Sequence, residues 1–388
     1  MSSLFYMSIM LLGGLLAGRL VKQIHLPNVT GYLLIGLLLG PFCLKVLPLD
    51  FVLNMRLAAD IALAFIAFTI GAEFKLSYLK KVGLTPIIIA LFEALAAVVA
   101  VTLGLLAFGF DLELALLLGA IASATAPAAT MMVVNQYKAK GPVTETLISV
   151  VALDDAVALM AFGFATAAVS AMEAPGEASL MMSILSPFIE IGGSIILGGI
   201  LGVLFTIPLK YFKKASNRTI IMAGFVFLGS ALADMLNLSP LLLCMCMGAM
   251  LTNISSSASS IMKLADNITP PIFLLFFVSS GAELDLSVLG SIGLIGILYI
   301  VLRVAGKILG ASAGAVIMKA PDTVKKYIGF TLVPQAGVAI GLSLIAAQKL
   351  PTYGPTIRAV ILCGTLVYEL IGPALTKIAL KKAGEIQA

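Results

Sequence analysis

The chain has 388 residues, of which 61% are hydrophobic and 11% are charged, and its formal net charge is +5 at pH 7. This composition indicates a polytopic membrane protein with very little chain outside the bilayer, so the basic excess reports topology rather than nucleic-acid binding. One histidine excludes a histidine cluster, and the four cysteines lie in apolar runs without zinc-like spacing. No GxGxxG or Walker pattern occurs and little chain follows the last apolar run, so we expect no cofactor, no ATP hydrolysis and no nucleotide-binding tail.

Hydropathy and helix punctuation predict an all-α fold of about thirteen transmembrane helices. The first apolar run has neither a basic n-region nor a small-residue cleavage site, so we expect it to be a retained helix. In chain order the spans lie near residues 4–20, 29–44, 57–74, 86–108, 114–134, 143–169, 183–205, 219–236, 240–252, 271–281, 290–316, 327–347 and 356–379.

The basic residues divide unequally between alternate loops. One set of loops holds only Lys45, Arg56, Lys349 and Arg358, and the other set holds all the remaining lysines and arginines outside the spans. The positive-inside rule then places the N-terminus outside and the C-terminus in the cytoplasm of a multi-pass protein. We expect it in the inner (plasma) membrane of the cell.

The chain also repeats itself. Residues 70–79, IGAEFKLSYL, match residues 280–289, SGAELDLSVL, at an offset of 210, and Gly40 falls on Gly248 at nearly the same offset. The matched spans end on opposite sides of the membrane, so the repeats are inverted, as in secondary transporters with a midplane site. Repeat one covers about 4–170, the connector helix about 183–205 and inverted repeat two about 219–379.

Two repeat-related spans each contain a proline near the middle. Pro127 follows Ser123 and Thr125 in the fifth span, and Pro334 precedes Gln335 in the twelfth. Because proline removes a backbone donor and clashes with the preceding turn, we expect two discontinuous helices that cross at the midplane around a small ion. The alternative is a pair of ordinary proline kinks.

The sixth span contains two adjacent carboxylates, Asp154 and Asp155. A charge at the bilayer centre costs on the order of 2.5–3.5 kcal/mol, so two in succession need an explanation. Neighbours on a helix point about 100° apart, which lets one carboxylate bind a mobile ligand and the other a fixed cation. The alternative is a buried ion pair that only helps to assemble the bundle.

The eleventh span supplies two cations, Arg303 and Lys307, four residues apart on one face. Gly306, Gly310 and Gly314 form a small-residue stripe that lets another helix approach closely. Lysine can lose its proton on desolvation, whereas arginine cannot. We therefore interpret Arg303 as structural, facing Glu93 at the matching repeat position.

Together these motifs resemble the monovalent cation–proton antiporters, and specifically the electrogenic bacterial sodium/proton exchangers with a double aspartate and an intramembrane lysine. The resemblance covers nearly the whole chain. It implies that Asp155 binds Na⁺, that Asp154 pairs with Lys307, and that Thr125 and Ser123 line the site. It also implies a homodimer, with core helices near 57–108, 114–169, 271–316 and 327–379 and a dimerisation domain formed by the remainder.

The sequence departs from the glutathione-gated potassium efflux proteins, which carry a non-acidic residue before a single aspartate. It also departs from the electroneutral exchangers, which have asparagine at the first position. We therefore predict a secondary active sodium (or lithium)/proton antiporter, electrogenic and working by alternating access, rather than an enzyme.

Three rival functions stay open: a potassium/proton exchanger of the same fold, a sodium-coupled symporter for an organic anion, and a channel. The partners are then Na⁺, Li⁺ or K⁺, protons and the lipid bilayer, and not nucleic acid. We expect Glu73 and Glu283 to be solvated helix-end charges and Asp60 to be either a funnel residue or a helix cap. Glu190 and Glu369 receive no role.

Overall fold

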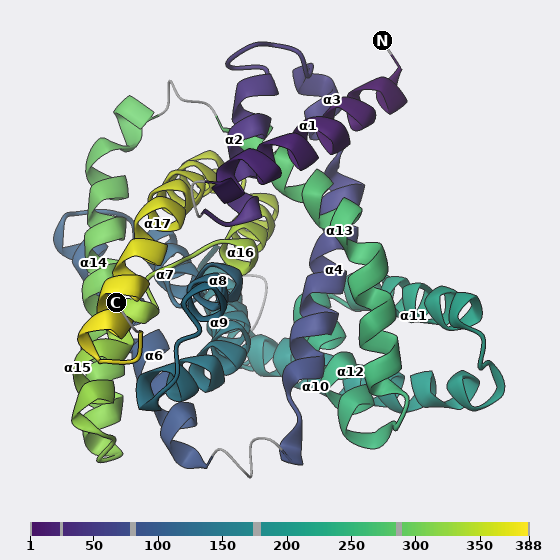
Figure 1. Cartoon of the computed structure of the whole chain (residues 1–388). Coiled ribbons are helices and arrows are strands. Elements are labelled where there is room, and N and C mark those ends of the chain that lie inside the picture. Colours follow the sequence, from purple (N-terminus) through teal and green to yellow (C-terminus); the bar gives the residue numbers. More distant parts are fainter. Residues whose placement is uncertain (1, 24–25, 78–82, 174–179, 285–288, 387–388) are drawn as a thin grey trace. The chain divides into compact units, whose positions relative to one another are not determined.

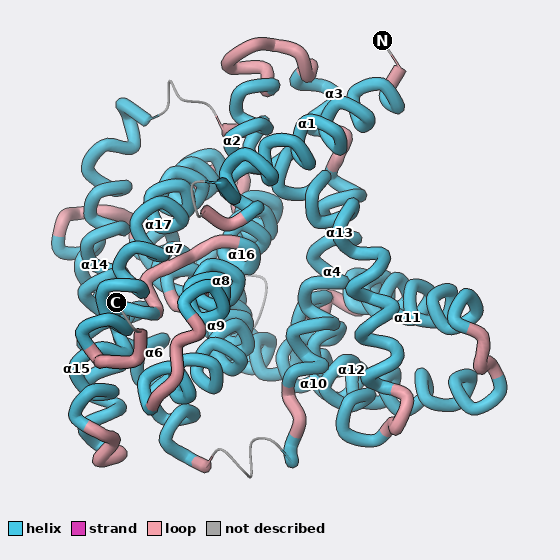
Figure 2. Tube along the Cα trace, viewed as in Figure 1, coloured by secondary structure: helices cyan, strands magenta, loops and turns pink. Residues whose placement is uncertain are grey.

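The computed structural model describes residues 2–23, 26–77, 83–173, 180–284 and 289–386, and these residues form helices joined by loops, with no strand among them (Figures 1 and 2). The ends of the repeat segments, residues 78–79 and 285–288, lie outside the described residues. In chain order the helices are α1 Ser3–Gln23, α2 Asn28–Leu39, α3 Leu49–Leu53, α4 Arg56–Glu73, α6 Leu84–Ala107, α7 Leu112–Ala122, α8 Pro127–Tyr137, α9 Pro142–Glu173, α10 Leu180–Tyr211, α11 Ala215–Met235, α12 Pro240–Ile254, α13 Ala258–Ala282, α14 Leu289–Ile317, α15 Asp322–Thr331, α16 Gly337–Lys349 and α17 Gly354–Lys382.

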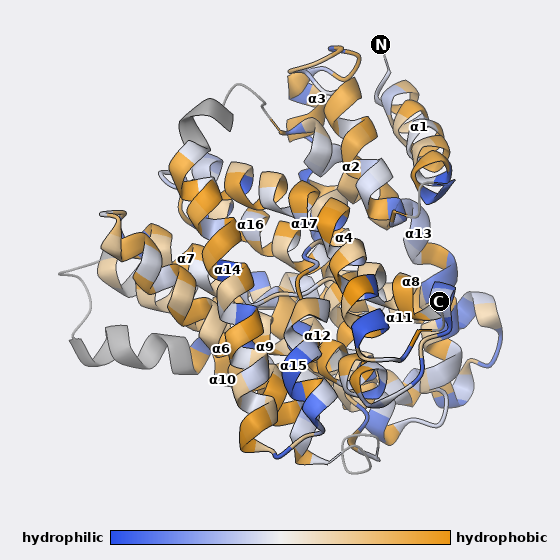
Figure 3. Cartoon of the chain, turned by 60° about the vertical axis from the view of Figure 1, so that its left-hand side comes forward, coloured by the Kyte–Doolittle hydropathy of each residue, from blue (hydrophilic) through white to orange (hydrophobic). Residues whose placement is uncertain are grey.

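Nine helices of the described chain are long and apolar enough to cross a membrane, and α2, α7, α12 and α16 are shorter apolar helices. Large apolar side chains remain exposed along several of these helices. On α6, for example, Leu95, Val99 and Leu103 follow one another at one-turn spacing and are 54%, 52% and 60% exposed. Apolar residues run along most of the helices (Figure 3), which is the pattern of helices that face lipid. The prediction of an all-α polytopic membrane protein is confirmed.

The two spans with central prolines are interrupted. Residues 123–126 separate α7 from α8, and residues 332–336 separate α15 from α16. Pro127 occupies the first turn of α8, where its missing N–H would have no helical partner in any case. The backbone N–H of Ala126 donates to the carbonyl oxygen of Pro334 at 2.9 Å, so the two breaks touch. The prediction of two discontinuous helices is therefore confirmed, and their crossing at the membrane midplane around an ion stays a prediction.

The tenth predicted span differs from the helix that forms. α13 begins at Ala258 rather than near residue 271, and it continues through Pro270 and Pro271. Polar residues precede the two prolines, and proline is common in the first turn of a helix, so the sequence pattern resembles a helix start at this point. Proline is tolerated inside membrane helices because neighbouring groups satisfy the carbonyls that it frees. The prediction of a short helix here was wrong.

The glycine stripe of α14 packs against α6, as its spacing predicts. A Cβ atom added at Gly306 would lie 2.8 Å from the carbonyl oxygen of Ala96, and one added at Gly310 would collide with the carbonyl oxygen of Phe92. At Gly314 the added atom would lie 3.0 Å from a backbone atom of α6. Because these positions lack side chains, the two backbones approach closely, and the cations of α14 come within reach of α6.

The chain divides into two compact units. Unit 1 comprises residues 1–57, 83–158 and 274–388, and unit 2 comprises residues 58–82 and 159–273. In unit 1, α2 and α13 cross at two glycines. A Cβ atom at Gly36 would collide with the carbonyl oxygen of Val278, and one at Gly281 would collide with that of Leu33.

Unit 2 contains a crossing of the same kind between α4 and α12. A Cβ atom at Gly71 would collide with the carbonyl oxygen of Met245, and one at Gly248 would collide with that of Phe68. Gly71 and Phe68 lie 210 positions before Gly281 and Val278 of unit 1. Met245 and Gly248 lie 212 positions after Leu33 and Gly36 of unit 1, and these two constant offsets support the repeat. The contacts match Gly248 with Gly36 rather than with Gly40. The extent of the repeats and the division into core and dimerisation helices stay predictions.

Candidate functional site

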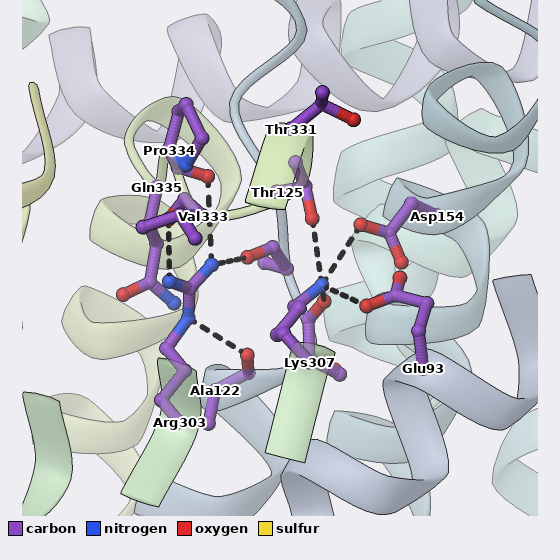
Figure 4. A network of polar contacts seen from close by, with 12 residues as sticks. Glu93, Ala122, Thr125, Asp154, Arg303, Lys307, Thr331, Val333, Pro334 and Gln335 are labelled. Carbon is purple, nitrogen blue, oxygen red and sulfur yellow. Dashed lines mark hydrogen bonds and ion pairs between the residues drawn. The ribbon is translucent and has the colours of Figure 1, made fainter. Parts of the chain in front are cut away.

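Arg303 holds the two helix breaks together. Its side chain is fully buried, and its guanidinium group donates at 2.7–2.9 Å to three backbone carbonyl oxygens and at 3.4 Å to a fourth (Figure 4). The acceptors are Ala122, Val333, Ala124 and, at the longest distance, Pro334. Helix ends leave such carbonyls without partners, and guanidinium offers five donors in a planar fork. The Cζ atom of Arg303 also lies over the ring of Tyr368, 4.4 Å from the ring centre.

Lys307, one turn further along α14, contacts two carboxylates. Its Nζ lies 2.7 Å from Oε2 of Glu93 and 3.0 Å from Oδ2 of Asp154, and all three side chains are fully buried. The same nitrogen donates to Oγ1 of Thr125 at 2.6 Å and to the carbonyl oxygen of Ser123. Figure 4 shows Lys307 turned toward the acids and Arg303 turned toward the carbonyls of the breaks. We call Glu93, Thr125, Asp154 and Lys307 the Lys307 cluster.

Glu93 contacts Lys307 rather than Arg303, which corrects the pairing expected from the repeat. Glu93 lies on the face of α6 that packs on the glycine stripe, and an added Cβ at Gly310 would lie 2.7 Å from the Glu93 Cα. Gly310 follows Lys307 by three residues and so lies on the same side of α14. The close approach of the two helices therefore places the Glu93 carboxylate beside the lysine. The signal in the sequence is the set of small residues three, four and seven positions after Glu93, at Ala96, Ala97 and Ala100, which mark this face of the fourth span for close packing.

Ser123 takes part through its backbone. Its hydroxyl donates to the carbonyl oxygen of Ala120 at 2.6 Å, so it is the Ser123 carbonyl oxygen that faces Lys307. Gln335 stabilises the other break: its Nε2 donates to the carbonyl oxygen of Ile121 at 2.9 Å, and its Oε1 accepts from the Tyr299 hydroxyl at 3.1 Å. The prolines interrupt the helices, and these polar groups satisfy the backbone that the interruptions expose.

Asp155 is buried next to Asp154 on α9 and is 4% exposed. Neighbouring side chains on a helix point about 100° apart, so the Asp155 and Asp154 carboxylates point in different directions from α9. Within the described residues no group of three or more acidic, histidine or cysteine side chains is arranged to hold a metal ion.

Three further acidic residues, Glu73, Glu283 and Glu369, differ in their exposure and in their partners. Glu73 is exposed, as expected for a helix-end charge. Glu283 is not a free helix-end charge, because Arg358 Nη2 lies 2.6 Å from its Oε2 and only 23% of the Glu283 side chain is exposed. Burial raises the pKa of Glu283, and Arg358 opposes that shift. Glu369 is buried in α17 beside Thr30, at a distance in sequence that no local pattern reveals.

Comparison with known proteins gives a family match over nearly the whole chain. Residues 7–382 match the family described as "Sodium/hydrogen exchanger, transmembrane". The chain is 23% identical over 420 residues to the high-affinity Na⁺/H⁺ antiporter NhaS3 of Synechocystis sp., an alignment that covers 96% of this chain and 88% of the relative. It is 29% identical over 156 residues to Na⁺/H⁺ antiporter 1 of Methanocaldococcus jannaschii, covering 38% of this chain and 35% of that one.

Solved structures show the same fold. The sodium proton antiporter MjNhaP1 from Methanocaldococcus jannaschii at pH 8 superposes with a TM-score of 0.81 at 18% sequence identity, over 98% of both chains. A second structure of MjNhaP1, from electron microscopy, gives a TM-score of 0.76 at 22% identity, over 99% of this chain and 98% of the other.

Proposed function

The chain belongs to the sodium/hydrogen exchanger family, and from that premise we propose that it is an electrogenic antiporter that exchanges Na⁺ or Li⁺ for protons across the plasma membrane. The cation ligand is Asp155, and Asp154 and Lys307 move with the transport cycle. One observation carries the proposal: a single buried lysine is shared by two buried carboxylates beside a pair of interrupted helices.

The charge balance of the cluster favours competition between protons and a metal cation. Lys307 brings one positive charge to Glu93 and Asp154, and Arg303 is bonded to backbone carbonyls rather than to either acid. With Asp155 also ionised, negative charge exceeds positive charge among side chains that are at most 4% exposed. Buried like charges disfavour the ionisation of both groups, so the cluster must bind a proton or a cation to compensate. A cation and protons then take the same oxygens in turn.

The contacts of Lys307 link cation binding to charge movement. A cation bound at Asp155 also attracts the adjacent Asp154, and this weakens the ion pair between Asp154 and Lys307. The lysine, unlike Arg303, can then release its proton from a desolvated position. Two proton-binding groups against one monovalent cation give a net movement of charge in each cycle.

The organic-anion symporter is disfavoured by the same contacts. An organic anion in the membrane requires a cation to pair with it. Within the site both candidates are engaged, Arg303 with four carbonyl oxygens and Lys307 with two carboxylates. A potassium/proton exchanger stays as the second candidate, because it would use the same groups.

The test is a dye-based proton-flux measurement in proteoliposomes, with the added cation and the imposed voltage varied. We expect Na⁺ and Li⁺ to release protons without organic solute and the rate to depend on voltage. Asp155→Asn should abolish cation-dependent proton movement, whereas Asp322→Asn, which changes an exposed aspartate at the start of α15, should leave it unchanged. Robust exchange by Asp155→Asn would refute the ligand assignment, and a response to K⁺ alone would favour the second candidate.

The proposed assembly is a homodimer in which the core helices move against a fixed dimerisation domain, with the N-terminus outside and the C-terminus in the cytoplasm. Mass measurement of the detergent-solubilised protein tests the dimer. Labelling of single introduced cysteines from each side of the membrane tests the topology.

A further inference from the structure

A buried carboxyl group that the proposed exchange does not use lies in α17. Glu369 is 1% exposed, and its Oε2 accepts a hydrogen bond from the Thr30 hydroxyl of α2 at 3.2 Å. Its other oxygen, Oε1, is buried and has no hydrogen-bond partner. An intramembrane carboxyl group in this position invites a functional explanation, because burying it is costly.

Two further buried oxygens without partners lie on the same face of α17. They are the Oγ1 atoms of Thr365 and Thr376, and both residues are fully buried. Thr365 is four residues before Glu369 and Thr376 is seven after it, so at helical spacing the three residues form one stripe. Gly372 lies on this face as well, and a Cβ atom there would lie 2.7 Å from Cγ of Pro334. The stripe of Thr365, Glu369 and Thr376, which we call the α17 stripe, therefore passes the break between α15 and α16.

No lysine or arginine of the described chain lies within ion-pair distance of Glu369. The helices packed against α17 are α2, α8, α14, α15 and α16. Their charged and titratable residues, together with those of α17 itself, are Tyr32, Tyr137, Tyr299, Arg303, Lys307, Asp322, Lys325, Lys326, Tyr327, Lys349, Arg358, Cys363, Tyr368, Lys377, Lys381 and Lys382.

The cations with assigned contacts are engaged elsewhere. Arg303 bonds the helix breaks, Lys307 pairs with its own two acids, and Arg358 pairs with Glu283. Lys325 pairs with Asp322, and Lys377 lies over the ring of Tyr137 at 4.6 Å. Glu369 thus differs from the carboxylates of the Lys307 cluster, each of which has a cation.

An ionised carboxylate in this setting would lack both a counter-charge and a partner for one oxygen. A neutral carboxylic acid avoids the charge penalty and offers an O–H donor. Buried oxygens without protein partners are commonly satisfied by ordered water, and the three such oxygens of α17 follow one another on one face at spacings of about one and two helical turns. We propose that Glu369 is a proton-binding carboxylic acid on a water-bearing α17 stripe, a second proton site separate from the Lys307 cluster.

A purely structural role is the alternative, in which the Thr30–Glu369 hydrogen bond only ties α2 to α17. Two variants separate the roles. Glu369→Gln keeps an acceptor for Thr30 but cannot bind or release a proton. Thr30→Val removes the hydrogen bond and keeps the carboxyl group.

The primary test is infrared difference spectroscopy of the purified full-length protein in lipid as the pH is raised. We expect a carbonyl-stretch band of a protonated carboxylic acid that is lost at alkaline pH, is absent in Glu369→Gln and persists in Thr30→Val. An unchanged band in Glu369→Gln would overturn the proposal. The measurement requires no transport, so it stands or fails independently of the proposed sodium/proton exchange.

The α17 stripe itself is tested without altering Glu369. In the double variant Thr365→Val/Thr376→Val the hydroxyl groups that hold the water are removed, so the carbonyl band should shift and should exchange more slowly into D₂O. A band that keeps its position and its rate of exchange would contradict the water-bearing stripe.

Proton flux in proteoliposomes supplies the functional readout. At acid pH Glu369 is protonated and neutral like glutamine, so wild type and Glu369→Gln should exchange at equal rates, and the rates should diverge as the pH rises. A rate difference that is the same at every pH would assign Glu369 a structural role and overturn the proposal.

Discussion

The Lys307 cluster and the α17 stripe are both buried acidic sites in unit 1, and they differ in one respect. Glu93 and Asp154 share a lysine, whereas Glu369 has only the Thr30 hydroxyl. An acid pair held by a cation can exchange that cation for another, so it suits coupled transport of metal ions and protons. An acid without a counter-charge is stable only when it is neutral, so it suits protons alone.

Lys307→Ala should have the largest effect on stability and exchange, because it removes the cation that distinguishes the Lys307 cluster from the α17 stripe. It leaves Glu93 and Asp154 without the cation that both contact. Removing one partner of a buried ion pair costs about 3–5 kcal/mol, so the free energy of unfolding should fall by that order. The voltage dependence of exchange should also be lost. Thermal unfolding in detergent and proton flux at imposed voltages measure the two effects, with Lys326→Ala at an exposed position as the control. Unchanged voltage dependence would argue against Lys307 as the group that moves charge.

Arg303→Lys tests the residue between the two acidic sites. Arg303 bonds the breaks beside the Lys307 cluster and lies over Tyr368, the neighbour of Glu369. A lysine cannot reproduce the planar fork, and each buried carbonyl left unbonded costs about 1–3 kcal/mol. We expect a lower unfolding temperature and slower exchange even though the charge is retained. Wild-type stability in Arg303→Lys would show that charge alone holds the breaks.

Glu93→Gln makes the Lys307 cluster more like a simple pair of one acid and one lysine. Removing a negative charge from the site makes the remaining groups release protons more readily. The pH profile of cation-dependent proton flux should therefore shift to lower pH, while exchange itself persists. Glu113→Gln is a suitable control, because Glu113 lies in the first turn of α7, away from the Lys307 cluster. A profile identical to that of wild type would mean that Glu93 carries no charge in the working cycle.

The smallest effect is expected at Glu385, which links α17, the helix of Glu369, to α9, the helix of Asp154. It follows the end of α17, and its carboxylate accepts from the backbone N–H groups of Val143 and Thr144 at the start of α9 at 2.7 and 2.8 Å. Helix caps of this kind contribute about 0.5–2 kcal/mol. Glu385→Ala should lower thermal stability by that order without changing the pH profile of exchange. A changed pH profile would show that the cap influences the site as well as the helix start.

The sequence by itself determined the membrane helices, the two interruptions and the residues that share a face with Lys307. Apolar runs, prolines and helical spacing act within one segment, so they can be read from it directly. α13 shows the limit of this, because two prolines inside a continuous helix look the same in the sequence as prolines at a helix start.

Only the tertiary structure decided which faces meet. It placed Glu93 as well as Asp154 beside Lys307, and it gave Arg303 four carbonyl oxygens as acceptors instead of an acid. It also brought Thr30 to Glu369, 339 positions away in the chain. The spacing of residues along a helix fixes the direction in which a side chain points. It does not fix the helix that lies opposite, because that depends on how closely the small-residue faces of the other helices can pack.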